Sequence, residues 1–213
     1  MDELEILKRD WKKKDHSFNQ ITEKEIYGML HKRSSSIVKW ILIISIVEIF
    51  LWSLLSFVAT DDNYNHRLEI LHLNVIIQVL NYINYGVILY FIFQFYTNYK
   101  KINTTDNIKI LMSSILKTRK TVKYYIWYNL AMMFFSLMLV FTFTLLYDPS
   151  IIKMTQSVSK SMSVNSFYAI ATGVFILFSL LIISAFWLFY KLIYGVLLKR
   201  LYGNYQELKK LEI

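Results

Sequence analysis

Cysteine is absent from this 213-residue chain, and proline and glycine are scarce, with one and five residues. The absence of cysteine excludes disulfides, thiol catalysis and zinc–thiolate sites. The scarcity of proline and glycine leaves few interruptions for long helices. The chain also has no serine elbow, no HExxH motif and no glycine loop that could cradle phosphate. We therefore predict a protein that is not an enzyme and that holds no cofactor or metal.

Hydrophobic residues dominate what is present. They make up 55% of the chain, and the mean hydropathy of +0.38 is too high for a soluble domain of this size. Four long apolar runs follow one another, at residues 37–60, 71–96, 124–147 and 167–190. At a rise of about 1.5 Å per residue, each run is long enough to cross a hydrocarbon core about 30 Å thick. The sequence therefore predicts an all-α fold, a four-helix transmembrane bundle with cytoplasmic amphipathic helical extensions.

The net charge of +9 invites a nucleic-acid interpretation, but the positions of the charges indicate membrane topology instead. Residues 98–123 carry seven Lys or Arg against one acidic residue, and residues 191–213 carry five against two. The basic residues of the connections 61–70 and 148–165 are only Arg67, Lys153 and Lys160. Basic residues on alternate connections place both termini in the cytoplasm, in a multi-pass protein that binds the lipid bilayer and no nucleic acid directly.

Residues 1–36 are predicted to form a cytoplasmic helical segment ahead of the membrane bundle of residues 37–213. Leu7 and Trp11 share an apolar face with the spacing of a short amphipathic helix. Thr22 followed by Glu25 has the pattern of a capping box and begins a second helix. We interpret the segment as a plain helical hairpin or, alternatively, as a docking segment in which Leu7 and Trp11 contact a partner.

Two further cytoplasmic stretches have amphipathic character. Residues 98–123 are predicted to form a cytoplasmic loop, in which the apolar face from Ile108 to Val122 indicates a basic amphipathic helix that continues into the third span. Residues 191–213 extend the fourth span with leucines at helical spacing. Such helices either lie on anionic lipid headgroups and pack on their neighbours, or form a docking surface for a cytoplasmic protein. The basic residues that we single out for this role are Lys109, Lys117, Arg119, Lys120, Lys199 and Arg200.

Glu48 is the one acidic residue within the first span. An ionised carboxylate at the centre of a membrane helix costs about 2.5–3.5 kcal/mol on insertion scales, so the side chain should face the bundle. Its expected partners are Asn81 or Asn84 of the second span, with Ser136 as a further candidate. We interpret Glu48 either as a proton or cation site or, with more weight, as a hydrogen-bonded staple that fixes helix packing.

The second span carries a polar stripe formed by Asn74, Gln78, Asn81 and Tyr85, at i, i+4, i+7 and i+11. Amides avoid lipid, so we expect the stripe to point into the bundle, with Asn84 nearby.

Acidic and histidine residues also gather at the outer edge of this span. We interpret them as a polar cap of the helix rather than as metal ligands.

Four stretches of the chain carry a family resemblance: LKRDWKKKDHSF, EIYGMLHKRSSSIVKWILIISIVE, ILKTRKTVKYYIWYNL and YKLIYGVLLKRLYGNYQELKKLE. Together they resemble small four-span bacterial membrane proteins that are often encoded beside an extracytoplasmic-function sigma factor. The resemblance implies a membrane-anchored, anti-sigma-like regulator in the bacterial inner membrane.

We therefore expect a non-enzymatic regulatory or scaffold protein that holds a cytoplasmic partner, with a sigma factor as the candidate. Two alternatives stay open. One is a small transporter or channel subunit that uses Glu48, and the other is a structural subunit of an envelope complex or a homo-oligomer.

Overall fold

The computed structural model describes residues 22–158 and 163–211. All regular structure in these ranges is helical. The helices are α2 (Glu23–Ala59), α3 (Asp62–Ile70), α4 (Asn74–Thr104), α5 (Ile108–Tyr147), α6 (Pro149–Val158) and α7 (Val164–Lys210). Four of them, α2, α4, α5 and α7, are long and apolar enough to cross a membrane. The predicted all-α bundle with four spans is confirmed.

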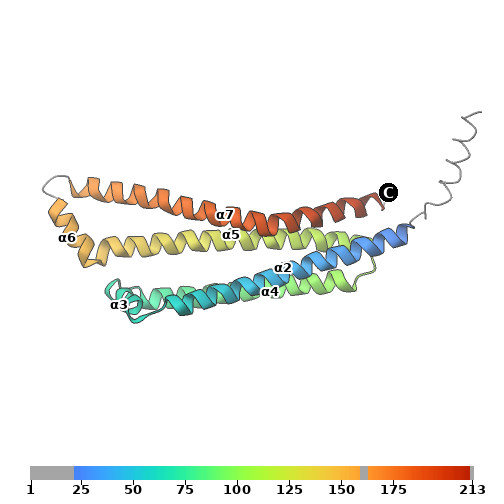
Figure 1. Cartoon of the computed structure of the whole chain (residues 1–213), viewed down its shortest axis with the longest axis horizontal. Coiled ribbons are helices and arrows are strands. Elements are labelled where there is room, and N and C mark those ends of the chain that lie inside the picture. Colours follow the sequence, from blue (N-terminus) through green and yellow to red (C-terminus); the bar gives the residue numbers. More distant parts are fainter. Residues whose placement is uncertain (1–21, 159–162, 212–213) are drawn as a thin grey trace, which may run out of the picture.

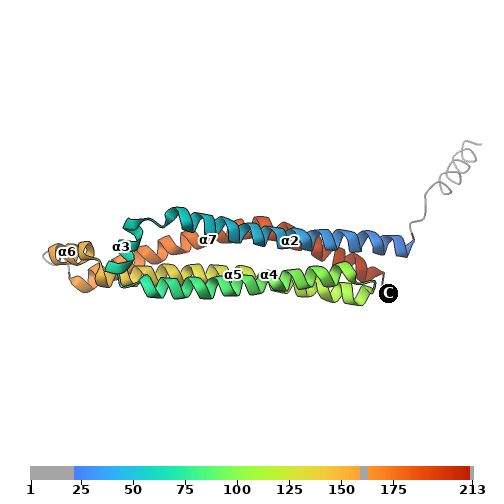
Figure 2. The same ribbon diagram turned by 90° about the horizontal axis from the view of Figure 1, so that it is seen from below.

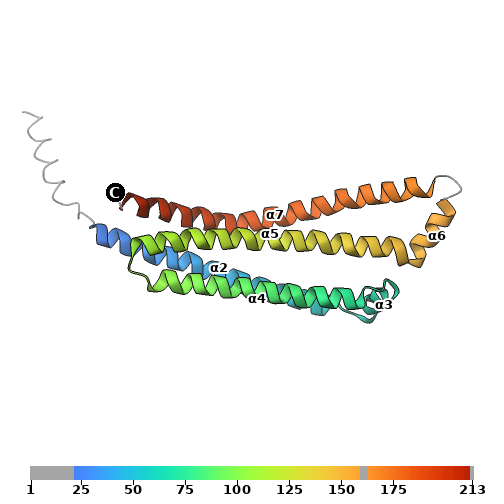
Figure 3. The same cartoon turned by 180° about the vertical axis from the view of Figure 1, so that it is seen from behind.

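The long helices form two antiparallel hairpins that lie side by side. In Figure 1 the α2–α4 hairpin lies beside the α5–α7 hairpin, and Figure 3 shows the same order from behind. Figure 2 shows two layers, with α2 and α7 in one and α4 and α5 in the other. The α4–α5 turn, the start of α2 and the end of α7 meet at one end, which we call the basic end. Helices α3 and α6 lie at the opposite end, which we call the open end.

The helices extend well beyond the predicted spans at the basic end. Helix α2 runs without a break from Glu23 through the serines at 34–36, so residues 23–36 are continuous with the first span. Helix α4 continues to Thr104, and only residues 105–107 separate it from α5. As predicted, the basic helix is continuous with the third span and the C-terminal extension is continuous with the fourth.

Two helix starts show how side chains fix these boundaries. The capping box is present, with Thr22 accepting from the Glu25 N–H and Glu25 accepting from the Thr22 N–H. The Thr22 N–H, together with its hydroxyl, holds the pKa of the Glu25 carboxyl below its ordinary value. At α5 the cap is Asn107, whose Oδ1 accepts from the N–H groups of Lys109 and Ile110.

The connections at the open end are helical, although the sequence indicated polar or weakly patterned loops. Asp61 accepts from the Tyr64 N–H at 2.7 Å and begins α3, which ends in a turn where His72 has a positive φ of 54°. Asp148 ends α5, as the following proline predicts, and its Oδ1 accepts from the Ser150 N–H to begin α6. The local caps therefore make short helices where hydropathy alone shows only polar connections.

The well-packed core lies toward the basic end. The main cluster of buried residues includes Val38, Phe95, Ile115, Val122 and Leu201, each 0% exposed. A second, smaller cluster of Leu68, Leu71 and Leu73 packs against α5 near the open end. Beyond Glu48, by contrast, residues 50–59 of α2 are all exposed. The bundle is therefore tightly closed at one end and loosely packed along α2 and α7 at the other.

Candidate functional site

A buried carboxylate, Glu48 of α2, is the centre of the strongest candidate site. The side chain is 9% exposed. It accepts hydrogen bonds from three tyrosine hydroxyl groups. Tyr125 at 2.9 Å and Tyr194 at 3.1 Å both donate to Oε2, and Tyr190 donates to Oε1. Because Tyr125 belongs to α5 and the other two belong to α7, this one carboxylate joins three of the four long helices.

The three tyrosines are held in place by their helices and by aromatic neighbours. Tyr190 and Tyr194 are four residues apart on one face of α7, with ring centroids 6.0 Å apart. Tyr125 packs edge to face against Phe91 and Phe95 of α4, with centroid distances of 5.5 and 5.7 Å. Helix α4 thus supplies an apolar wall against the Tyr125 ring, and Glu48 supplies the acceptor that buried tyrosine hydroxyls require.

The depth of the site differs between the helices. Along α2, Glu48 lies in the middle of the apolar run. Tyr125, however, follows Lys123 by only two residues on α5, and Tyr190 directly precedes Lys191 on α7. The carboxylate therefore lies level with the basic-side boundary of two apolar runs, where a charged group costs less than at the bilayer centre.

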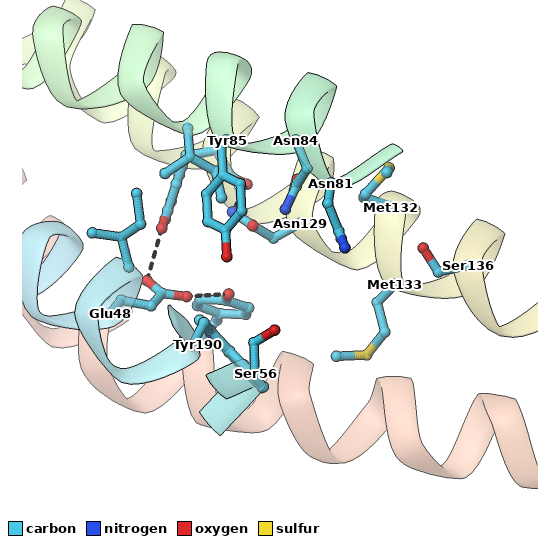
Figure 4. Close-up of a pocket in the computed structure, with 14 residues that line it drawn as sticks. Glu48, Ser56, Asn81, Asn84, Tyr85, Asn129, Met132, Met133, Ser136 and Tyr190 are labelled. Carbon is cyan, nitrogen blue, oxygen red and sulfur yellow. Dashed lines mark hydrogen bonds between the residues drawn. The ribbon is translucent and has the colours of Figure 1, made fainter. Parts of the chain in front are cut away.

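A cavity of about 240 Å³ opens beside Glu48 inside the bundle. Figure 4 shows Asn81, Asn84 and Tyr85 projecting from α4 into the cavity, on the side opposite Glu48. The polar residues that line it, besides Glu48 itself, are Ser56, Asn81, Asn84, Tyr85, Tyr125, Asn129, Ser136 and Tyr190. Two of the amides are anchored: Asn84 accepts from the Tyr128 hydroxyl at 3.1 Å, and Asn129 donates to the backbone oxygen of Tyr125 at 2.8 Å.

The prediction that Asn81, Asn84 or Ser136 is the hydrogen-bond partner of Glu48 is wrong. Asn81, Asn84 and Ser136 line the same cavity, but none of them bonds the carboxylate. Glu48 points toward the junction of α2 with α5 and α7, where long tyrosine side chains reach it. The amides project from α4 on the other side of the cavity.

The predicted polar stripe of α4 is divided in two. Asn74 and Gln78 bond each other, with 2.9 Å between Gln78 Nε2 and Asn74 Oδ1, and Gln78 is exposed. Asn81 and Tyr85 line the cavity. Only the half of the stripe nearer the basic end therefore lines the cavity, although Asn81 and Tyr85 are both exposed, and the other half is satisfied within its own helix.

No cationic side chain balances Glu48 within the described ranges, where its three hydrogen-bond partners are all tyrosines. The same ranges contain no group of three or more His, Cys, Asp or Glu residues that could hold a metal ion. The carboxylate is thus well supplied with hydrogen-bond donors, but its charge has no partner of opposite sign.

The six basic residues singled out in the sequence all lie at the basic end, but they are not equivalent. Arg119 is half-buried, with its guanidinium carbon 4.1 Å from the ring centroid of Tyr202. Its Nε is buried and has no hydrogen-bond partner in the part of the chain that the structure describes. It packs between α5 and α7 instead of standing free. The exposed members of the set are Lys109, Lys117, Lys120, Lys199 and Arg200. The proposed docking residues Leu7 and Trp11 lie outside the described residues.

Sequence reasoning found Glu48 but missed the tyrosines that hold it. Tyr125 and Tyr190 lie at the ends of apolar runs, where tyrosine is typical of an interfacial aromatic belt, so their positions do not connect them with Glu48. One signal was available, because Tyr190 and Tyr194 are four residues apart and so share a helix face.

Comparison with known proteins identifies one family. No curated protein and no solved structure matches the chain. A family described as a domain of unknown function (DUF8845) matches residues 24–213, which include all of the helices described above except Glu23, the first residue of α2. The chain therefore belongs to the DUF8845 family.

Proposed function

We propose that this protein is a non-enzymatic regulator in the bacterial inner membrane that holds a cytoplasmic protein, an extracytoplasmic-function sigma factor, on its basic end. The observation that carries the proposal is the length of the helices. Helix α5 has 40 residues and α7 has 47, which correspond to about 60 and 70 Å. A hydrocarbon core is about 30 Å thick.

The excess length forms a packed structure at the basic end. Leu111 and Ile115 of α5, with Leu201 and Leu208 of α7, are 0% exposed, so the apolar faces of the helices cover one another. The positive-inside rule requires basic loops, but it does not require a packed helical bundle beyond the membrane. Membrane topology alone therefore does not account for a rigid basic projection, and such a projection is suited to binding a partner with an acidic surface.

The partner surface in this proposal comprises the exposed cations Lys117, Lys120, Lys199 and Arg200, on α5 and α7. Association with an acidic protein surface gains mainly in rate and specificity from such charges. The sigma factor as the partner follows from the family resemblance, and the basic surface is compatible with it.

The test is co-purification from native membranes in mild detergent, with the sigma factor encoded beside the gene quantified by mass spectrometry. We expect it at near-stoichiometric yield with the wild-type protein. Combined Lys117→Glu, Lys199→Glu and Arg200→Glu substitution should reduce the yield at least tenfold. The Lys153→Glu variant, which changes one charge on α6 at the open end, is the control and should retain the partner.

The genetic counterpart is expression of the sigma factor's regulon. Deletion of the gene and the triple charge reversal should change it in the same direction, whereas Lys153→Glu should not. A sigma factor that is absent from the purified wild-type protein, together with unchanged regulon expression in the deletion strain, would refute the proposal.

A further inference from the structure

Glu48 belongs to two cavities. Besides the polar cavity inside the bundle, a second cavity of about 410 Å³ lies between α2 and α7, and Glu48 and Trp52 line both. Apart from Glu48, the lining of the second cavity is mostly apolar and includes Val47, Leu51 and Trp52 of α2 with Phe186 and Phe189 of α7. We call it the α2–α7 groove. One carboxylate therefore stands where a polar cavity meets an apolar one.

The α2–α7 groove faces outward. Val47, Leu51 and Phe189 of its walls are 58%, 52% and 52% exposed. These residues lie within apolar runs long enough to span a membrane, and in the proposed topology the groove therefore opens toward the lipid of the bilayer. An occupant of the groove must therefore be apolar along its length and must come from the lipid phase.

The Glu48 carboxylate determines which chemical group the occupant must carry at the end that lies outside the apolar groove. A carboxylate has about four acceptor positions, and the tyrosines fill two on Oε2 and one on Oε1. One position on Oε1 remains, with a negative charge that no described cation balances. The described residues contain no group of three or more His, Cys, Asp or Glu side chains that could hold a metal ion here.

An ammonium group fits these conditions better. It can use one carboxylate lone pair and complete its contacts with aromatic ring faces, of which Trp52 and Tyr85 line the cavity. Trp52 also packs against Phe186 at 5.8 Å between ring centroids, where the polar cavity meets the groove. A molecule with its head at Glu48 would therefore have its tail against these two rings.

We infer that Glu48 and the α2–α7 groove together bind an amphiphilic organic cation from the bilayer, with its ammonium head at Glu48 and its apolar chain in the groove. This site is separate from the basic end, and it neither requires nor excludes the partner proposed there. The head supplies the positive charge that the buried carboxylate lacks, and the chain fills apolar space open to lipid.

The test is equilibrium binding of radiolabelled decylammonium to the full-length protein in phosphatidylcholine nanodiscs. Three unlabelled competitors separate the contributions: decylammonium has head and chain, decanol has the chain without the charge, and ethylammonium has the charge without the chain. We expect decylammonium to compete at least tenfold better than either of the others. Equal competition by decanol would overturn the role of Glu48, and equal competition by ethylammonium would overturn the role of the groove.

Two variants locate the site. Glu48→Gln should weaken decylammonium binding at least tenfold, whereas Glu69→Gln, an exposed carboxyl on α3, should leave it unchanged. Leu51→Trp fills the groove from an exposed position and should also weaken binding at least tenfold. Binding within twofold of wild type in Glu48→Gln or in Leu51→Trp overturns the inference.

A measurement on the wild-type protein covers the case in which Glu48→Gln does not fold. Hydrophobic carbodiimides modify carboxyl groups in membranes, and mass spectrometry can locate the adduct on Glu48. The ligand here is dimethyldecylammonium, because a tertiary amine forms no amide with the activated carboxyl group. It should slow the modification at least fivefold, and decanol should not. Equal rates with and without dimethyldecylammonium would overturn the inference.

Discussion

At the scale of single residues, Glu48 concentrates several interactions in one group. Three hydroxyls donate to its two oxygens, and hydrogen bonds to a charged acceptor contribute about 1.5–3 kcal/mol each. Removing one donor should therefore lower the free energy of unfolding, although the carboxylate keeps the other two hydrogen bonds.

We predict that Tyr125→Phe lowers the free energy of unfolding by about 1.5–3 kcal/mol, because it removes a donor from a buried carboxylate. The matched control is Tyr124→Phe, whose side chain is 57% exposed and should change stability by less than about 0.5 kcal/mol. Denaturation in mixed micelles measures both. Equal losses in the two variants would show that the Tyr125 bond to Glu48 contributes nothing.

Asn98 is the opposite case, because it is 0% exposed and neither its Oδ1 nor its Nδ2 has a partner among the described residues. An unsatisfied buried polar group costs about 1–3 kcal/mol. We predict that Asn98→Leu raises the melting temperature. Asn204→Leu should lower it, because Asn204 is equally buried but donates to the Ser34 hydroxyl at 3.0 Å. A lower melting temperature in both variants would mean that the Asn98 amide is stabilising.

The sequence could identify Glu48 as unusual because hydropathy exposes a carboxylate in an apolar run. It could not identify the partners, because these depend on how each helix is rotated about its axis. Tyr124 and Tyr125 are neighbours of the same type at the same depth. One points outward and the other toward Glu48, and only the packing of α5 on α4 and α7 decides which.

At the scale of helices, the long apolar and amphipathic patterns were sufficient to predict every span. The two short helices at the open end were not predicted, because they depend on single caps. Asp61 begins α3 and Asp148 begins α6, whereas a hydropathy pattern averages over many residues and does not detect one side chain.

The start of α2 gives a prediction at this scale. Thr22→Ala should weaken the first turn by about 1 kcal/mol, because it removes the side-chain acceptor for the Glu25 N–H. Amide exchange at residues 23–27 measures the change, while exchange in the α5 core should not alter. Unchanged protection of the first turn would mean that the capping box is not needed there.

The same turn should depend on pH. The pKa of Glu25, which lies ahead of the apolar run that begins at residue 37, is lowered in the folded state. A lowered pKa stabilises the fold above the unfolded pKa, and that stabilisation is lost as the pH falls through the folded pKa. Protection of the first turn should therefore decrease on acidification below about pH 4.5. Thr22→Ala should show less of this dependence.

At the scale of the whole molecule, the absence of cysteine gives a direct test of orientation. We predict that Lys117→Cys at the basic end reacts with a membrane-impermeant maleimide only after cells are permeabilised. Lys153→Cys in α6 should react in intact spheroplasts, because the open end faces outward in the proposed topology. The reverse pattern would place the basic end outside and remove the proposed cytoplasmic partner.

The part of α5 that extends beyond its apolar run also affects how far salt screens its charges from those of the membrane. Residues 108–123 of α5 precede its apolar run and extend roughly 24 Å along the helix axis. At physiological ionic strength the Debye length is about 8 Å. Lys117 precedes the apolar run that begins at residue 124 by roughly 10 Å, little more than one Debye length, whereas the α4–α5 turn lies about three Debye lengths away. In the proposed topology, anionic headgroups therefore compete with an acidic partner for Lys117 and Lys120, while the far end of α5 lies beyond their field.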